Sequence, residues 1–333
     1  MGTDFWSGRR VLVTGAGGFV GARLAEALID NGAVVNALVR DRPANDGLDL
    51  LGLQSRVNMV HGSVEDHDLA ARVLNEYEVD TVFHLAAQAL VGAANRSPAS
   101  TFESNIRGTW TVLESCRLNP LVKRVVVASS DKAYGTQPEL PYREDQPLLA
   151  INPYDVSKAC ADALARSYYH AFSLPVAVTR CANIYGGGDL NFSRLVPGTI
   201  RSALKGEPPV IRSDGTPLRD YIHVDDAINA YLMLAERADE DGISGRAFNF
   251  GANQPIKVMD LTQAILSACG RSDLEPDIRG EGKLGTEIDQ QYLDSSMAHA
   301  VLGWTPSTTL EAGLASAIEW YRGHFRAHGF GEA

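Results

Sequence analysis

The sequence predicts an α/β protein with a doubly wound parallel sheet and a smaller C-terminal lobe. Three observations support this prediction. Short apolar runs alternate with amphipathic helical stretches through the first half of the chain, which is typical of parallel strands connected by helices. A glycine-rich turn joins the first apolar run to the first helix. A polar cluster follows the apolar run at 125–128, where parallel strands commonly present ligand-binding side chains.

The elements of the first half follow this alternation in order. After the apolar run that begins at Val11, a helix is expected over 22–29 and ends near Asn31 and Gly32. Pro153 suits the first position of a later helix, for which Asn152 can act as the N-cap. The other predicted strands are 34–39, 57–61, 80–85, 125–128 and 175–180, and the other predicted helices are 66–77 and 99–116.

The second half is less regular and contains more proline and glycine. We place the boundary of the smaller lobe at 183–333, and we expect 225–255 to return to the first domain. The predicted elements here are helices at 195–204, 224–235, 258–269 and 309–325 and strands at 209–212 and 247–250.

Gly15, Gly18 and Gly21 stand at three-residue spacing between the first strand and the first helix. Glycines in this position allow a tight turn and a close backbone approach to a pyrophosphate that faces the helix N-terminus. A glycine-rich turn without a ligand is the alternative. We therefore predict that 1–182 forms a dinucleotide-binding Rossmann domain.

The choice between NAD and NADP stays open from the residues alone. An acidic residue about 20 positions beyond the glycines favours NAD, because its carboxylate binds the free ribose. The second strand ends with Arg40, Asp41 and Arg42. Either arginine can pair with the 2′-phosphate of NADP, whereas Asp41 can accept hydrogen bonds from the ribose hydroxyls of NAD.

Tyr154 and Lys158 are four residues apart, which places them on one face of a helix. A free tyrosine has a pKa of about 10, and a neighbouring cation lowers that pKa by favouring the phenolate. Such a pair can take a proton from a sugar hydroxyl. The spacing also occurs by chance on solvated helices, so its meaning depends on the other motifs.

Ser130, Asp131 and Lys132 form the polar cluster after the strand at 125–128. Ligands of open parallel sheets bind beyond the carboxyl ends of the strands. We expect Ser130 to contact a substrate hydroxyl beside Tyr154, with Asp131 and Lys132 in the same crevice. A polar strand-to-loop turn without catalytic function is the alternative.

Composition restricts the classes of partner and the compartment. The net charge of −11 argues against nucleic acid and anionic membranes as partners. No apolar run approaches the roughly 18 residues that span a membrane, and the N-terminus does not read as a signal peptide. The four cysteines are widely spaced, so we expect no metal site and reduced thiols in a cytoplasmic protein.

Taken together, these segments resemble the extended short-chain dehydrogenase/reductase family of nucleotide-sugar enzymes. Within that family, Ser130-Asp131-Lys132 looks most like the 4,6-dehydratases, which have Thr-Asp-Glu or, in the CDP-glucose 4,6-dehydratases, Thr-Asp-Lys. The segments 186–189 and 194–197 are also similar to the CDP-glucose branch. The shared motifs are Thr14-Gly15-x-x-Gly18-Phe19-x-Gly21, His84-Leu85-Ala86-Ala87, Tyr154-x-x-x-Lys158, Asn183-Ile184-Tyr185-Gly186 and Arg219-Asp220-Tyr221.

The resemblance implies an NAD(P)-dependent nucleotide-sugar 4,6-dehydratase, a lyase of deoxysugar biosynthesis. Tyr154 would deprotonate the hexose 4-hydroxyl, assisted by Lys158 and Ser130, while a hydride leaves C4. Water would then leave across C5 and C6 with Asp131 as general acid. The hydride would return to C6 and give a 4-keto-6-deoxy sugar nucleotide. Lys132 would remove the C5 proton if neutral, or stabilise the enolate if charged.

The resemblance also implies the ligands of each site. The enzymes that the chain resembles use NAD, which stays tightly bound and is regenerated, although Arg40 and Arg42 allow NADP. The expected cofactor-binding residues are Gly15, Gly18, Phe19, Val20, Gly21, Arg40, Ala86, Tyr154 and Lys158. The nucleotide-diphosphate sugar is expected to contact Asn183, Asn191, Arg194, Arg219 and Tyr292, with the arginines on the diphosphate.

Three further expectations concern single features of the chain. His84 is expected to be a packed histidine at a strand end rather than a catalyst. The family usually has an aspartate near the adenine where this chain has Gly62-Ser63-Val64, and Asp66 is displaced from that point. Two copies are expected to form a homodimer through the helix that carries Tyr154 and the helix before it.

Three alternative functions use the same motifs. A nucleotide-sugar 4-epimerase would use Ser130, Tyr154 and Lys158, but epimerisation needs no acid for a leaving hydroxyl, so Asp131 argues against it. A nucleotide-glucuronate decarboxylase would need a group that binds the C6 carboxylate, and the sequence indicates none. A non-catalytic nucleotide sensor would not need the tyrosine and lysine.

Overall fold

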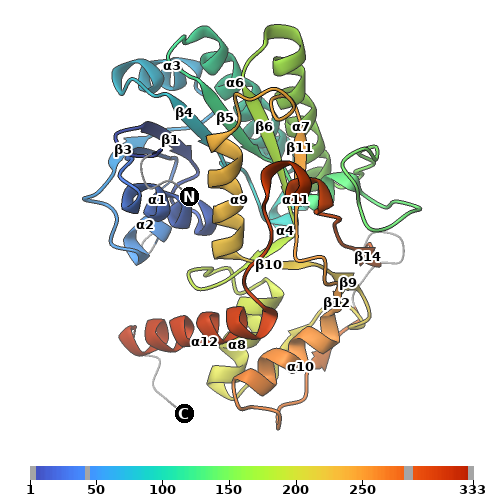
Figure 1. The fold of residues 1–333 in the computed structure, drawn as a ribbon. Coiled ribbons are helices and arrows are strands. Elements are labelled where there is room, and N and C mark those ends of the chain that lie inside the picture. The colour runs from blue at the N-terminus through green and yellow to red at the C-terminus, as the bar shows by residue number, and fades with distance from the viewer. Residues whose placement is uncertain (1–4, 42–45, 281–287, 329–333) are drawn as a thin grey trace.

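The computed structural model describes residues 5–41, 46–280 and 288–328. At its centre lies a parallel sheet of seven strands in the order β11-β6-β5-β4-β1-β2-β3 (Figure 1). The chain runs from β1 outward to β3 and then crosses back to β4, so the strand order reverses between β1 and β4. The strands of this sheet are β1 (Arg10–Thr14), β2 (Val34–Val39), β3 (Asn58–His61), β4 (Thr81–His84), β5 (Arg124–Ala128), β6 (Val176–Cys181) and β11 (Ala247–Phe250).

Helices follow the strands as the alternating pattern predicts, and the long helices expected from the sequence lie within a few residues of their expected bounds, except the one expected at 99–116. Shorter helical segments had no clear sequence pattern. The helices are α1 (Phe19–Asp30), α2 (Gly47–Leu50), α3 (His67–Glu76), α4 (Val91–Arg96), α5 (Pro98–Phe102), α6 (Gly108–Leu118), α7 (Pro153–Phe172), α8 (Leu195–Lys205), α9 (Val224–Glu236), α10 (Val258–Ala268), α11 (Ser296–Leu302) and α12 (Leu310–Ala327).

Two local expectations need correction. The single helix expected at 99–116 is α5 and α6 joined by a π-helical turn, η1 (Glu103–Arg107). That wider turn lets the Asn105 side chain donate to the Gln88 carbonyl and to Ser157 Oγ on α7, at 3.2 and 2.8 Å. Asn152 occupies the N-cap position of α7, but its side chain makes no cap bond and donates instead to the Asp155 carboxylate.

Alternate residues of the central strands pack on opposite faces of the sheet. Val11 and Val13 of β1 belong to the apolar cluster that α1 and α9 cover, whereas Leu12 belongs to the cluster beneath α3 and α6. This two-residue period leaves apolar side chains on both faces. It explains why the strands read as continuous apolar runs rather than as alternating ones.

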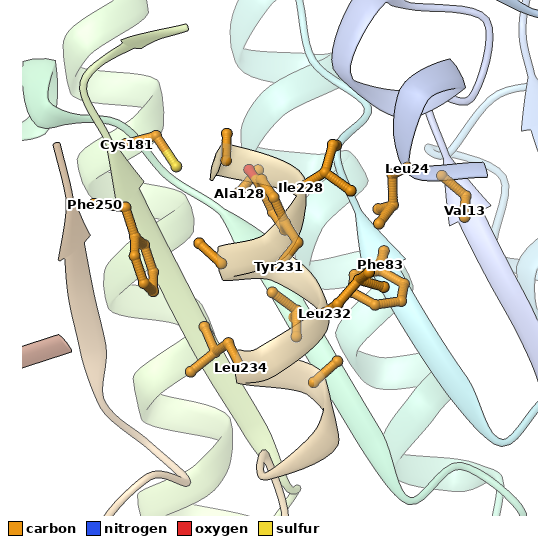
Figure 2. Packing of buried hydrophobic residues seen from close by; sticks show 14 of the residues in the cluster. Val13, Leu24, Phe83, Ala128, Cys181, Ile228, Tyr231, Leu232, Leu234 and Phe250 are labelled. Carbon is orange, nitrogen blue, oxygen red and sulfur yellow. The ribbon is translucent and has the colours of Figure 1, made fainter. Parts of the chain in front are cut away.

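The segment around α9 and β11 lies in the main sheet layer although it follows part of the smaller lobe in sequence. β11 pairs in parallel with β6. Figure 2 shows Ile228, Tyr231 and Leu232 of α9 among buried side chains of the central strands, including Phe83. Burying apolar side chains of this size contributes about 1.5–3 kcal/mol each, so α9 is part of the main core.

The smaller lobe has its own apolar core. α8, α10 and α12 pack together through Ile200, Ile265 and Ile318, at the end of the molecule away from α3 and α6 (Figure 1). Short strands connect the lobe to the sheet layer. They are β7 (Asn183–Tyr185), β8 (Val210–Ile211), β9 (Leu218–Arg219), β10 (Tyr221–His223), β12 (Ile256–Lys257), β13 (Asp277–Ile278) and β14 (Gln290–Gln291).

A buried ion pair and its hydrogen-bond partners connect four elements of the main domain. The fully buried Arg180 of β6 donates from Nε and Nη2 to both carboxylate oxygens of Asp162 on α7, at 2.8 and 3.0 Å. Its Nη1 donates to Tyr134 Oη at 2.7 Å, and that hydroxyl donates to Asn249 Oδ1 of β11 at 2.7 Å. Because Tyr134 ends the 3-10 turn η2 (Asp131–Tyr134), this network fixes the turn relative to α7.

We predict that Asp162→Asn lowers the free energy of unfolding by about 3–5 kcal/mol, because it leaves the Arg180 charge buried and unpaired. Urea unfolding followed by circular dichroism measures the effect. Glu76→Gln is the matched control, since Glu76 pairs with Arg72 on the exposed surface of α3; a change within about 0.5 kcal/mol is expected there. Equal effects of the two substitutions would contradict the assigned role of the buried pair.

Candidate active site

The glycine turn between β1 and α1 lies where the strand order reverses. Gly15 has φ +74, and a Cβ added there would lie 2.8 Å from the backbone nitrogen of Ala86, which follows β4. A Cβ at Gly21 would collide with the Gly15 carbonyl oxygen. Both positions therefore need glycine for the turn to pack between the strand ends. The N-terminus of α1 consequently lies at the crevice where open α/β sheets bind ligands.

A cavity of about 290 Å³, which we name the glycine-turn cavity, lies beside this turn. Its walls contain Gly15, Gly18, Arg40 and Ala86 from the expected cofactor set. Gly62-Ser63-Val64 also line it, whereas Asp66 caps α3 by accepting from Leu69 N at 3.0 Å. Arg42 falls outside the described residues.

The residues of the glycine-turn cavity fit the adenosine part of a dinucleotide. The cavity contains a buried carboxyl oxygen, Asp46 Oδ2, that has no hydrogen-bond partner among the described residues. Buried polar atoms rarely lack a partner, so such an atom indicates a ligand that donates to it. Together with the glycine turn, this oxygen supports a nucleotide with free hydroxyl groups.

The second cavity, which we name the central cavity, has a volume of about 620 Å³ and lies at the carboxyl ends of β4, β5 and β6. Ala87 lines both cavities, so they adjoin. Val20 of the expected cofactor set lines the central cavity, and Phe19 packs near Gly188. The structure brings all five expected catalytic residues to its walls: Ser130, Asp131, Lys132, Tyr154 and Lys158.

Tyr154 and Lys158 lie on the first turns of α7 and face the central cavity. Burial, followed by the nearby Asp131 carboxylate, raises the pKa of Tyr154 to about 12. Burial lowers the pKa of Lys158 to about 8, and its Nζ donates to the Ala128 carbonyl at 2.8 Å. The expectation that Lys158 lowers the pKa of Tyr154 is thus wrong for this structure, because the ammonium group is directed to the end of β5.

Asp131 lies at the start of η2 with its carboxyl group buried. Burial raises its pKa against the opposing charge of Lys132. Ser130 Oγ donates to Asp131 Oδ1 at 3.1 Å, whereas Oδ2 has no hydrogen-bond partner among the described residues. A carboxyl group in this environment retains its proton to a higher pH than an exposed one. It is therefore suited to donate a proton to a leaving group.

Lys132 lies next to Asp131 and points towards the smaller lobe. Its Nζ donates to Gln291 Oε1 of β14 at 3.3 Å. Gln291 is fully buried, and its Nε2 has no partner among the described residues. The ammonium group of Lys132 thus links the turn η2 to β14.

The wall of the central cavity that belongs to the smaller lobe is rich in arginine. Arg194 precedes α8, and its Nη1 donates to the buried Asp189 Oδ2 at 2.9 Å. Asn183 and Asn191 also line the cavity; the Asn183 amide donates to the Asp220 carbonyl at 3.1 Å. A fixed guanidinium beside polar amides can bind a diphosphate.

Two of the expected substrate ligands lie elsewhere. Arg219 is buried near Asp131 and donates to the carbonyls of Leu218 and Asp289. Neither it nor Tyr292 belongs to the described lining of the central cavity, and the Tyr292 carbonyl accepts from Tyr142 N. Their roles in substrate binding stay predictions.

The central cavity also contains residues that the sequence analysis missed. Arg212 follows β8 and Arg96 ends α4, and both line the cavity. Neither lies in a recognisable motif, so no sequence signal places them there. Tyr231 of α9 lines it as well, but its helical spacing marks it only as a core residue.

His84 ends β4 and is buried behind the central cavity. Its Nδ1 lies 2.9 Å from Thr14 Oγ1, and its Nε2 lies 3.1 Å from Thr109 Oγ1. Burial, followed by the charge of Lys158, lowers the pKa of His84 to about 3. The ring is therefore neutral at physiological pH and bonded on both sides, as expected for a packed histidine.

The described residues contain neither a membrane-spanning helix nor a cluster of metal-ligating side chains. Among 5–41, 46–280 and 288–328, no helix is both long and apolar enough to cross a bilayer. The same residues contain no group of three or more His, Cys, Asp or Glu side chains placed to hold a metal ion.

Comparisons with known proteins agree with this geometry. Residues 11–251 match the model of the NAD dependent epimerase/dehydratase family. CDP-glucose 4,6-dehydratase of Salmonella typhimurium is 30% identical, over 97% of this chain and 93% of that protein.

Two solved structures represent a 4-epimerase and a 4,6-dehydratase among the similar proteins. UDP-glucose 4-epimerase of Thermotoga maritima, solved with UDP-glucose, has a TM-score of 0.86 at 30% identity and covers 95% of this chain and 99% of its own. dTDP-glucose 4,6-dehydratase of Streptomyces venezuelae, solved with NAD, has a TM-score of 0.84 at 28% identity and covers 96% and 98%. The chain is thus similar to dehydratases and epimerases of nucleotide sugars.

We predict that acid destabilises the protein through His84. In the unfolded chain this ring takes up a proton near its ordinary pKa of 6.5, whereas the folded protein resists protonation until about pH 3. Acid therefore favours the unfolded state, and between pH 7 and pH 5 this group removes about 2 kcal/mol of stability. Urea unfolding at both pH values measures the decrease in the free energy of unfolding between them. This decrease should be smaller by that amount in His84→Asn than in the wild type. An identical loss in both proteins would refute the neutral, buried assignment.

Proposed function

The chain belongs to the NAD dependent epimerase/dehydratase family, and we propose that it is a nucleotide-sugar 4,6-dehydratase of the CDP-glucose type. The observation that carries this proposal is the buried carboxyl group of Asp131, whose pKa is raised, in the same cavity as Tyr154. Elimination of water needs such an acid, whereas oxidation at C4 alone does not. Sequence identity does not decide between the two reactions, since the Salmonella typhimurium dehydratase and the Thermotoga maritima epimerase are both 30% identical to this chain.

A dinucleotide would be held by the glycine turn, the walls of the glycine-turn cavity, Val20 and Lys158. When bound, its nicotinamide ring accepts a hydride from C4 of the hexose and returns it to C6. We propose NAD as this cofactor, since Asp46 offers an acceptor for free hydroxyl groups and the dehydratase from Streptomyces venezuelae was solved with NAD.

Proton transfers are assigned to the residues of the central cavity. Tyr154 takes the proton of the 4-hydroxyl, with Ser130 bonding to the same oxygen. Since the pKa of Tyr154 is raised to about 12 in this structure, we expect the Lys158 ammonium to turn from the Ala128 carbonyl towards the phenol when substrate binds. The resulting cation–phenolate contact would lower that pKa.

The 4-ketone makes the C5 proton acidic, so water can leave across C5 and C6. Asp131 protonates the departing 6-hydroxyl, and its raised pKa keeps the required proton available. Lys132, bonded to Gln291, lies beside it and is assigned the C5 proton: its amine takes up that proton as water leaves and returns it to C5 when the hydride reaches C6. Arg194, held by Asp189, with Arg212 is assigned to the diphosphate.

A 4-epimerase is the second candidate, favoured by the TM-score of 0.86 to the Thermotoga maritima enzyme. It would use Ser130, Tyr154 and Lys158 in the same way. It would leave the acid chemistry of Asp131 without a use, and we therefore rank it second.

The test of the proposal is a product assay with CDP-glucose, dTDP-glucose, UDP-glucose, GDP-mannose and UDP-glucuronate, analysed by mass spectrometry and proton NMR. A dehydratase yields a product lighter by one water molecule with a new C6 methyl doublet. A product of unchanged mass with an inverted C4 proton coupling would replace the proposal with the epimerase.

We predict that Tyr154→Phe and Asp131→Asn stop the reaction at different points. Tyr154→Phe should abolish oxidation at C4 while the cofactor stays bound. Asp131→Asn should still oxidise C4, but should form the dehydrated product about 100-fold more slowly or worse, because the general acid is lost. The exposed Asp145→Asn is the control and should retain normal turnover. A normal rate of dehydration in Asp131→Asn would remove this residue from the mechanism.

We also propose that two copies pair through α6 and α7. Trp110 of α6 and Phe172 of α7 are exposed large apolar side chains, at 40% and 55%. Pairing through these two helices would cover both side chains and so remove apolar surface from water. Sedimentation should find a dimer at micromolar concentration and a shift towards monomer in Trp110→Arg. A wild-type protein that sediments only as monomer would contradict the pairing.

A further inference from the structure

We propose that Asp46 recognises the ribose hydroxyls of the adenosine half of the cofactor, and that this contact makes the protein select NAD over NADP. The inference rests on the dinucleotide site of the proposed function and names the residue that sets its selectivity. Sequence reasoning considered Arg40, Asp41 and Arg42 for this role and did not consider Asp46.

The first observation is the state of the Asp46 carboxyl group. The residue is 5% exposed and lines the glycine-turn cavity. Its Oδ1 accepts from Asp49 N at 2.9 Å and so caps α2, whereas Oδ2 has no hydrogen-bond partner among the described residues. A buried carboxylate oxygen without a donor is costly, and a ligand that donates to it removes the cost.

The second observation is that the neighbouring backbone holds Asp46 against the glycine turn. Gly47 N donates to the Gly17 carbonyl at 2.8 Å. A Cβ at Gly47 would lie 2.6 Å from Ala22 Cβ and 2.9 Å from the Gly18 carbonyl oxygen, so only glycine allows this approach. A Cβ at Gly17 would lie 3.4 Å from Asp46 Oδ2. The carboxyl group is therefore held against the glycine turn.

The third observation concerns the residues at the end of β2. Arg40 Nε donates to Asp41 Oδ2 at 2.7 Å, and the two side chains are 59% and 71% exposed. Arg40 Nη1 also lies 3.4 Å from Ser104 Oγ, which itself donates to Glu65 Oε1 at 2.7 Å. The guanidinium is thus paired with the Asp41 carboxylate, and Ser104 links it to the carboxylate of Glu65. A 2′-phosphate placed beside it would meet their negative charge, which weakens the case for NADP.

The chemistry of the two cofactors then separates them. The 2′- and 3′-hydroxyls of NAD can donate to Asp46 Oδ2, and hydrogen bonds to a charged acceptor are the stronger kind. NADP carries a phosphate in place of the 2′ hydrogen, so it loses one donor and brings a second negative group near a buried carboxylate. Asp46 would therefore take the place that an acidic residue about 20 positions beyond the glycines has in other Rossmann domains.

The test is a titration of the full-length protein, freed of co-purified nucleotide, with NAD and with NADP by isothermal calorimetry. Asp46→Asn is the informative variant, because an asparagine oxygen can still cap α2 and preserve the fold. We expect the Kd for NAD to rise about tenfold or more, with the Kd for NADP unchanged or lower. The ratio of the Kd for NADP to the Kd for NAD should therefore fall at least about tenfold relative to the wild type.

Asp41→Asn is the matched control and should change that ratio by less than about threefold, since Asp41 is exposed and paired with Arg40. The proposal is overturned if Asp46→Asn leaves the ratio at the wild-type value, if Asp41→Asn shifts it as much, or if the wild type prefers NADP. The titration needs no sugar nucleotide. If the wild type dehydrates its substrate but Asp46→Asn has the same ratio of Kd values as the wild type, only this inference is refuted. If Asp46→Asn changes the ratio as expected but the wild type forms no dehydrated product, only the proposed reaction is refuted.

Discussion

The bidentate ion pair between Arg180 and Asp162 is the contact on which the geometry of the central cavity depends. Asp162 lies one helical turn beyond Lys158 on α7, and Arg180 continues through Tyr134 to the turn that begins with Asp131. The helix of the proposed oxidation step and the turn of the proposed elimination step are therefore held in one buried network. Because both side chains are fully buried, removal of either charge would leave the other buried without its partner.

Burial, more than pairing of charges, determines the titration of the groups in the central cavity. It raises the pKa of Asp131, raises that of Tyr154 and lowers that of Lys158 to about 8, so it shifts each group towards its neutral form while Lys158 stays mainly an ammonium at neutral pH. A neutral acid suits Asp131 for proton donation, whereas a phenol with a pKa of about 12 is a poor base at neutral pH. The cavity in its present arrangement thus suits the proposed elimination, whereas the proposed oxidation requires movement of Lys158.

The sequence predicts the central strands and the long helices well, because each depends on a local pattern, and it also singles out the five residues that line the central cavity, whose catalytic roles stay predictions. The apolar runs of β1 and β5 and the spacing of Tyr154 and Lys158 are visible without coordinates. Arg212, Arg96 and Asp46 could not be found in this way, since their place at a cavity depends on how separate segments meet. The expectation of a lowered Tyr154 pKa is wrong for two reasons. Burial raises that pKa, and the Lys158 ammonium donates to the Ala128 carbonyl, and neither can be read from residue spacing.

The central claim is that oxidation at C4 and elimination across C5 and C6 occur in one cavity on one bound substrate. The most direct measurement is the fate of deuterium placed at C4 of the sugar nucleotide that the enzyme accepts, read by NMR of the product. The account predicts a product with one deuterium in its C6 methyl group, because the hydrogen removed from C4 returns to C6 of the same molecule. Deuterium found at C4 of an epimerised sugar, or lost to the solvent, would contradict it.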